Sequence, residues 1–562
     1  MTAPEPAATA PATEERRSWL PMVCLFLAQV LMSFNVAALP VSLGGMVEDF
    51  GVPPTVVSST IVVYGLVVAA LVMTGAKIGQ RVGWVLVFRV VVVTFGVSAL
   101  LMILSPTVGW AIAGQSLAGA SAAIIVPALV ALIAENYRGA QQATAIGALG
   151  SARAISGVSA FFLGGALGTL VGWRPVFGIV LLLAVAVLAF SFTLRSDGGN
   201  ADVHIDVVAA VLIGVAVMLL TLGFNNLNTW GLFYATPDAP FDVGGVSPAP
   251  VLVLCGVVLG QTFFWWTRRR MAAGKVPLVD LSVLASPRER AAVYAMFIIV
   301  ALEGALNFTV PLYIQIVQGR TPFDTALAMM PFNLTVFVTA TLVVRFYRRY
   351  PPRTIGVFGF VLTTAALLWL SFVVTNNWET LPTILGLFVF GVGQGALVTL
   401  VFNVLVTAAP TSRAGDVGSI RGTTQNLASA VGTAIAGALL VTLLSFNVGR
   451  AVVEHVEIPP SLVAQVDLDA VNFVSNDELR GVLEDTDATP AQVEAAVEVN
   501  EETRLDTLRL GLLILAGVSA TAILPASRLP AYTPDEIPDP ETSGGPDPEP
   551  EPEPDRDDRS RV

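Results

Sequence analysis

Two charged residues, Arg153 and Glu303, lie near the middle of long apolar runs of this chain. A charge in the hydrocarbon core of a bilayer is costly, and it is usually kept there for function. Glu303 is about 12 residues into its run, roughly 18 Å along a helix, and Asn307 follows on the same face. A carboxyl group in hydrocarbon takes up a proton more readily than one in water. We therefore expect Glu303 to bind a proton or a cation, although a carboxyl that only locks two helices fits the same pattern.

Arg153 lies at a similar depth in its own run. A guanidinium does not lose its proton, so it must meet a carboxylate, backbone carbonyls or an anionic ligand. One arrangement satisfies both charges. We hypothesise an Arg153–Glu303 pair across a cavity between two helix bundles, in one state of a transport cycle.

Further polar residues lie inside other apolar runs and are candidates for lining a substrate cavity. Besides Arg153 and Asn307 they are Gln29, Ser33, Asn35, Gln115, Gln394 and Asn403. Polar side chains on inward helix faces can line a water-filled path. They can equally form interhelical hydrogen bonds, which contribute roughly 0.6 kcal/mol each on average. Both interpretations remain open for each residue.

The elements that position these residues are predicted to be membrane helices. Hydrophobic residues make up 54% of the 562 residues, and the mean hydropathy is +0.73. A span needs roughly 20 apolar residues to cross about 30 Å of hydrocarbon. We place fourteen spans at 19–43, 55–75, 84–104, 108–133, 142–166, 174–194, 205–225, 250–267, 291–316, 324–345, 354–375, 381–408, 420–446 and 506–525.

Basic residues gather in alternate connections, whereas the short connections between them hold little beyond Arg174 and Arg320. The positive-inside rule then places both termini in the cytoplasm. We expect the chain to lie in the inner (plasma) membrane of the cell as a multi-pass protein. We expect residues 1–18 to be disordered, and residues 526–562 to form a disordered acidic tail, because they have too little apolar surface to fold. Residues 447–505 are predicted to be an extracytoplasmic loop with helix signals at Ser475 and at Thr489-Pro490. This loop is interpreted as a small cap, with substrate capture as the alternative.

The composition also excludes several classes of site. The chain has two cysteines and two histidines, all isolated, and a net charge of −12. We therefore expect no metal site, no cofactor, no nucleic-acid partner and no catalytic residues. The sequence contains no Gly-x-x-x-x-Gly-Lys-Ser/Thr motif for binding ATP phosphates.

Several short stretches, in order, resemble the major facilitator superfamily and its fourteen-helix drug:proton antiporter branch. They are Ala38-Leu39-Pro40, Ala76 to Gly83, Gly119 to Pro127, Gly164-Gly165 with Trp173-Arg174, Pro277 to Leu281, and Pro311 to Gln315 followed by Gly319, Pro322 and Pro331. The resemblance covers nearly all of the membrane part. It implies two six-helix bundles with two extra linking helices.

The departures concern charges. The family's acid in the first helix falls on Leu31, its loop Asp on Gln80, and its fourth-helix Arg on Gln115; its antiporter Gly-Pro falls on Ala160-Phe161. Proton coupling therefore does not carry over with the resemblance. Within the loop motif Gly79, Gln80, Arg81 and Gly83, we expect Arg81 and Gly83 to form a cytoplasmic latch that is weakened by the missing Asp.

We thus expect an all-α membrane protein with bundles at 19–194 and 291–525 and linking helices within 195–290. The expected function is export of lipophilic or amphipathic small molecules by alternating access, with protons as a candidate coupling ion. Two alternatives stay open: an uncoupled facilitator or exporter of an envelope lipid or anionic metabolite, and a transport-incompetent accessory or sensor. The expected partners are a small-molecule substrate and the lipid bilayer, with the chain as a monomer.

Overall fold

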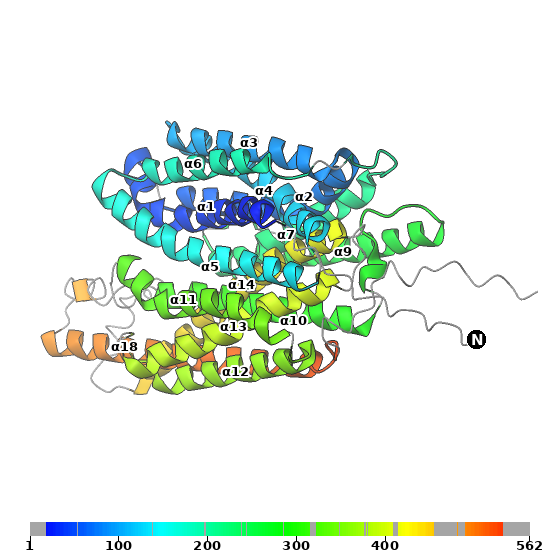
Figure 1. The fold of residues 1–562 in the computed structure, drawn as a ribbon. Coiled ribbons are helices and arrows are strands. Elements are labelled where there is room, and N and C mark those ends of the chain that lie inside the picture. The colour runs from blue at the N-terminus through cyan, green and yellow to red at the C-terminus, as the bar shows by residue number, and fades with distance from the viewer. Residues whose placement is uncertain are drawn as a thin grey trace, which may run out of the picture.

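The chain forms long, nearly parallel helices, shown in Figure 1. This computed structural model describes residues 18–531, apart from 53, 138, 196–197, 238, 243, 285, 315–321, 348, 376–377, 379, 408–413, 455–479 and 482–488. Among the described residues, 13 helices are long and apolar enough to cross a membrane. A further helix of 41 residues, α14 (Ala414–Glu454), covers the remaining predicted span. The expected all-α membrane architecture is confirmed.

Six helices pack together as the first bundle, drawn blue to cyan in Figure 1. They are α1 (Leu20–Phe50), α2 (Pro54–Val82), α3 (Trp84–Ile103), α4 (Val108–Asn136), α5 (Gly139–Leu170) and α6 (Arg174–Ser191). Small residues allow these helices to approach closely, as membrane helices require. At Gly119 of α4, for example, an added Cβ would lie 2.7 Å from the Tyr64 carbonyl oxygen of α2.

The second bundle contains six helices from the other half of the chain. They are α10 (Pro287–Leu312), α11 (Pro322–Tyr347), α12 (Pro352–Val373), α13 (Leu381–Thr407), α14 and α18 (Pro490–Thr521), which is followed by the short α19 (Ile523–Ala526). Close packing again depends on glycine. An added Cβ at Gly432 of α14 would lie 2.0 Å from the Ala301 carbonyl oxygen of α10.

The linking segment forms a helix pair, α7 (Val207–Asn225) and α9 (Pro248–Ala272), with the short α8 (Leu227–Trp230) between them and the 3-10 turn η1 (Leu281–Leu284) after them. Helix α7 contacts both α2 and α14. The Asp206 carboxylate caps the start of α7 and pairs with Arg270 of α9 at 3.1 Å. Helix α7 therefore lies against the seam between the two bundles, and α9 packs against α7.

Two elements differ from the predicted boundaries in the region around the long loop. Helix α14 begins six residues before the predicted span, and α18 begins at Pro490, well before residue 506. Thr489 caps α18 in a capping box with Gln492, which confirms the predicted start signal there. Charged residues in the first turns of α18 hid these turns from a hydropathy reading. The predicted signal at Ser475, the segment 1–17 and the tail beyond residue 531 lie outside the described residues.

The two bundles meet along one half of their length. In the first half of α5, an added Cβ at Gly147 would lie 2.7 Å from Val344 of α11, and Ser151 hydrogen-bonds Thr341 of α11. At the start of α14, added Cβ atoms at Gly415, Gly418 and Gly422 would meet α2, α3 and α4 at 2.6–2.8 Å. These contacts lie toward the end that carries residues 76–83, which we call the predicted cytoplasmic end.

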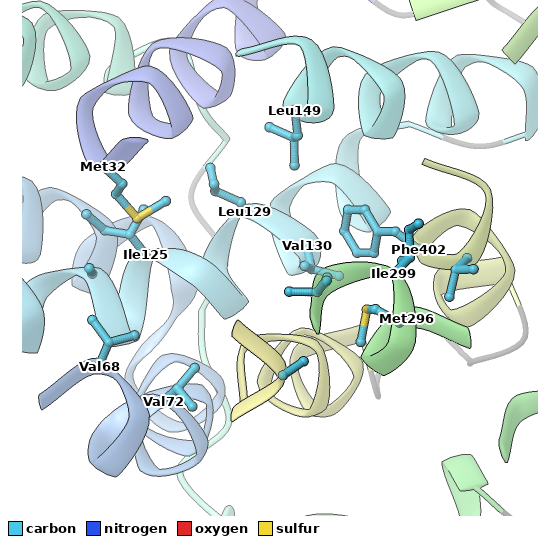
Figure 2. Close-up of a cluster of buried hydrophobic side chains, with 14 of the residues drawn as sticks. Met32, Val68, Val72, Ile125, Leu129, Val130, Leu149, Met296, Ile299 and Phe402 are labelled. Atoms are coloured by element: carbon cyan, nitrogen blue, oxygen red, sulfur yellow. The ribbon is translucent and has the colours of Figure 1, made fainter. Parts of the chain in front are cut away.

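An apolar layer fills the seam at this end, as Figure 2 shows. Val130 of α4 and Leu149 of α5 face Met296 and Ile299 of α10 and Phe402 of α13. All five side chains are at most 3% exposed. The layer joins the two bundles by packing and excludes water from the seam.

The glycine contacts give a matched test. Gly147→Ala would insert a methyl group 2.7 Å from Val344 and 3.0 Å from the Ala340 carbonyl oxygen, whereas the nearest atom to a Cβ at Gly157 is 4.0 Å away. Both changes gain about 1 kcal/mol of helix propensity, but overpacking costs Gly147→Ala about 1–3 kcal/mol. We expect the Gly147→Ala protein to melt at a lower temperature than Gly157→Ala in thermal unfolding of the purified protein. Equal melting temperatures would show that α5 and α11 are not tightly packed here.

Candidate functional site

The ion pair hypothesised from the sequence is present. The Arg153 Nη2 atom of α5 lies 3.0 Å from the Glu303 Oε1 atom of α10. Because α5 belongs to the first bundle and α10 to the second, this contact joins the two bundles near the middle of their helices. The Arg153 side chain is 39% exposed and that of Glu303 is 16% exposed. The pair therefore borders open space and is not sealed in the core.

Gln394 of α13 holds the other carboxylate oxygen. Its Nε2 atom donates a hydrogen bond to Glu303 Oε2 at 2.8 Å. Glu303 is thus fixed by one group from each bundle. The Gln394 Oε1 atom is buried and has no hydrogen-bond partner among the described residues. A buried amide oxygen without a partner is unusual, and it can accept a hydrogen bond from a bound molecule.

Asn307, one turn beyond Glu303 on α10, is exposed. Its position agrees with the i+4 spacing that placed it on the Glu303 face. The polar face of α10 therefore continues from the ion pair toward the opposite end of the molecule.

Arg421 of α14 belongs to the same region and was missed by the sequence analysis. It is 7% exposed, and its guanidinium carbon lies 3.9 Å from the centre of the Phe402 ring. No ion pair between described residues includes Arg421. The predicted span begins at residue 420, which places Arg421 at the edge of the membrane. The helix begins at Ala414, which places Arg421 about two turns inside.

The candidates in the first bundle have a different arrangement. Asn35 of α1 and Gln115 of α4 are at most 1% exposed and hydrogen-bond each other, with Asn35 Nδ2 donating to Gln115 Oε1 at 3.0 Å. Gln29 donates to Ser33 one turn away at 2.9 Å. These contacts favour the interhelical and intrahelical hydrogen bonds that the sequence left open. Asn403 of α13 directly follows Phe402 and is 8% exposed.

A second ion pair joins the bundles at the predicted cytoplasmic end. The Lys77 Nζ atom of α2 lies 2.9 Å from Asp416 Oδ1 at the start of α14, and both side chains are at most 7% exposed. Gln80 accepts a hydrogen bond from Lys77 at 3.0 Å and donates one to Asp416 at 3.2 Å. The Asp280 backbone N–H also donates to Asp416 at 3.3 Å. We call Lys77, Gln80 and Asp416 the end latch.

The latch differs from the one expected at Arg81 and Gly83. Arg81 is exposed, and no ion pair between described residues includes it. Gly83 is instead the turn between α2 and α3, with a φ of +106° that favours glycine. Gln80 stands where the family has an Asp, and its amide bridges a lysine on its own helix and an aspartate on α14. The acid of this contact is Asp416 from the other bundle.

The end latch gives a stability test. Removing one partner of a buried ion pair costs about 3–5 kcal/mol, whereas replacing both with apolar groups is close to neutral. We expect Asp416→Asn to lower the melting temperature of the purified protein clearly, and the double variant Lys77→Met with Asp416→Leu to restore most of the loss. A double variant no more stable than Asp416→Asn would contradict a paired contact.

Comparisons with known proteins agree with this geometry. The sequence profile described as Major Facilitator Superfamily matches residues 25–433. "Multidrug resistance protein Stp" of Mycobacterium tuberculosis is 24% identical over 519 residues, which cover 91% of each chain. "Multidrug efflux pump LfrA" of Mycolicibacterium smegmatis is 24% identical over 77% of this chain and 82% of its own. The "Probable actinorhodin transporter" of Streptomyces coelicolor is 25% identical over 78% of this chain and 75% of its own.

Solved structures show the same fold. The human organic anion transporter MFSD10 superposes with a TM-score of 0.56 at 12% identity, over 90% of this chain and 99% of its own. The proton:xylose symporter XylE superposes with a TM-score of 0.53 at 10% identity, over 90% of this chain and 94% of its own. The profile match covers well over half of the chain, and the two-bundle arrangement agrees with it. The chain therefore belongs to the major facilitator superfamily and is a multi-pass membrane transporter of small molecules.

Proposed function

We propose that the protein exports lipophilic or amphipathic small molecules across a bacterial cytoplasmic membrane by alternating access, with Glu303 as the proton-binding group. The observation that carries the proposal is the Arg153–Glu303 pair, which joins the two bundles at mid-depth. The relatives named as multidrug and antibiotic transporters support the substrate class. Their bacterial origin supports the membrane.

The conformation supports one step of such a cycle. The end latch, the apolar layer and the glycine contacts all join the bundles toward the predicted cytoplasmic end. At the other end, the last described glycine of α5, Gly168, has no atom within 4 Å of an added Cβ. In the proposed cycle, the observed arrangement of the bundles is the state that is closed to the cytoplasm. Substrate leaves this state to the outside.

A proton on Glu303 would change the contact between the bundles. The neutral carboxyl no longer attracts the Arg153 guanidinium, so the one charged contact at mid-depth between α5 and α10 weakens. Loss of the proton restores the pair. The protonation state of a single side chain thereby biases which arrangement of the two bundles is favoured.

Magnitudes indicate that the proton does not act alone. Reversing a two-state equilibrium from 1:99 to 99:1 takes about 5.5 kcal/mol. Losing one partner of a fully buried pair costs about 3–5 kcal/mol, and this pair is partly exposed, so its contribution is smaller. In the proposed cycle, substrate binding therefore supplies the rest of the free energy for the change between the two states. This change includes the opening of the end latch.

Transport into proteoliposomes tests the proposal. We expect uptake of at least one amphipathic dye from a panel of ethidium, Nile red and 5-carboxyfluorescein to be stimulated by an imposed pH gradient. Glu303→Gln cannot bind and release the proton, so we expect its gradient-driven transport rate to be about tenfold lower than that of the wild-type protein. Substrate exchange in the absence of a gradient should be unchanged.

Glu48→Gln is the matched control, because Glu48 is an exposed acid at the far end of α1, and we expect wild-type rates for it. Flux that ignores the gradient in the wild-type protein would indicate a facilitator. No flux of any dye would contradict transport of this substrate class.

A further inference from the structure

The region around the ion pair carries more positive than negative charge. Arg153 and Glu303 cancel each other, but Arg421 adds a second guanidinium. Phe402 of α13 lies one turn beyond Thr399, and the Thr399 hydroxyl oxygen would lie 3.3 Å from a Cβ at Gly150, one turn before Arg153 on α5. Arg421 and Arg153 therefore lie in the same region between the bundles. No carboxylate among the described residues lies within ion-pair distance of Arg421. The three groups together carry one net positive charge inside the membrane part of the protein.

An uncompensated buried cation is costly in a low-dielectric interior. Arg421 lies about 10 Å along α14 from the start of the helix. This distance is too long for the groups at the helix end to compensate its charge. The Phe402 ring under the guanidinium recovers only part of the lost hydration, because a cation–π contact is weaker than the hydration that a buried charge loses. A bound anion would supply the missing negative charge.

The surroundings also suit the apolar part of a ligand. The Phe402 ring lies under the Arg421 guanidinium, and Phe402, Met296 and Ile299 form one side of the apolar layer in Figure 2. Binding sites for small molecules commonly combine apolar walls with a few placed polar groups. Here the charged group is the Arg421 guanidinium, and guanidiniums bind carboxylate and sulfonate oxygens through paired N–H donors.

Resting on the proposed function, we propose that the transported molecules are amphipathic anions, with Arg421 binding the anionic group and Phe402 contacting the apolar body. Arg153 stays paired with the Glu303 carboxylate, so the anion and the proton bind at separate groups. Cationic amphiphiles are disfavoured by the same net charge. Neutral analogues bind without a contribution from Arg421.

Binding of three matched probes to the full chain in lipid nanodiscs tests the proposal. The probes are 1-naphthoate, the neutral 1-naphthamide and the cationic 1-naphthylmethylammonium, measured by titration calorimetry at neutral pH against empty nanodiscs. We expect naphthoate to bind about tenfold more tightly than the ammonium compound. Arg421→Gln should weaken naphthoate about tenfold and leave naphthamide within about twofold.

Two further variants separate charge from packing. Arg421→Lys keeps the charge, so we expect most of the preference for naphthoate over naphthamide to remain. Arg345→Gln removes one positive charge from an exposed position on α11 and should change neither affinity. The proposal is overturned if the ammonium compound binds more tightly than naphthoate, if Arg421→Gln weakens both naphthyl ligands equally, or if none of the three binds. Loss of the proposed export function would appear separately, as missing dye flux in a protein that still prefers naphthoate.

Discussion

The contact on which the structure depends is a charge pair between two bodies that otherwise meet by packing. Arg153 and Glu303 come from helices far apart in the chain, and each would be costly near mid-membrane without the other. Satisfying both requires the two bundles to face each other in one register. Among the described residues, the Lys77–Asp416 pair is the other ion pair that joins the bundles, at the predicted cytoplasmic end. The closed seam thus extends from the Arg153–Glu303 pair at mid-depth to the Lys77–Asp416 pair at the predicted cytoplasmic end.

Between the two pairs, the seam is tightly packed and mostly apolar, with the Arg421 guanidinium against Phe402 as its charged group. Val130, Leu149, Ile299 and Phe402 exclude water there, and glycines on α5 and α14 bring the helix backbones together. Packed interfaces of this kind have discrete arrangements and do not deform continuously. Ion pairs at both edges add a cost to partial opening, because a half-open seam would leave charges unpaired. The seam is therefore suited to two states, closed or open.

Much of the fold could be predicted from the sequence, because bilayer thickness sets the length of an apolar run. Arg153 and Glu303 were found for the same reason: a charge in such a run is conspicuous. Their pairing was inferred from the free-energy cost of an unpaired charge in the membrane. The structure contains this pair. Arg421 was missed because its significance depends on a helix boundary seven residues away, and helix ends are poorly marked by hydropathy.

Other parts of the site depend on which helices become neighbours. Nothing in the sequence pairs Asn35 with Gln115, or Lys77 with Asp416 more than 300 positions away. The loop motif suggested Arg81 as the latch, yet Lys77 pairs with Asp416, whereas Arg81, one turn nearer the end of α2, is exposed. Such contacts follow from tertiary packing, and single-sequence periodicity carries no information about them.

The most direct measurement is the distance between the outer ends of the bundles when the charge on Glu303 is removed. Spin labels at Leu170 of α5 and Leu381 of α13, both highly exposed, would report it by double electron–electron resonance in a Cys24→Ala, Cys255→Ser background. If the Arg153–Glu303 pair biases the arrangement of the bundles, Glu303→Gln adds a population with a shorter distance, as the outer ends approach and the cytoplasmic end opens. Superimposable distance distributions with and without Glu303→Gln would contradict that role for the pair.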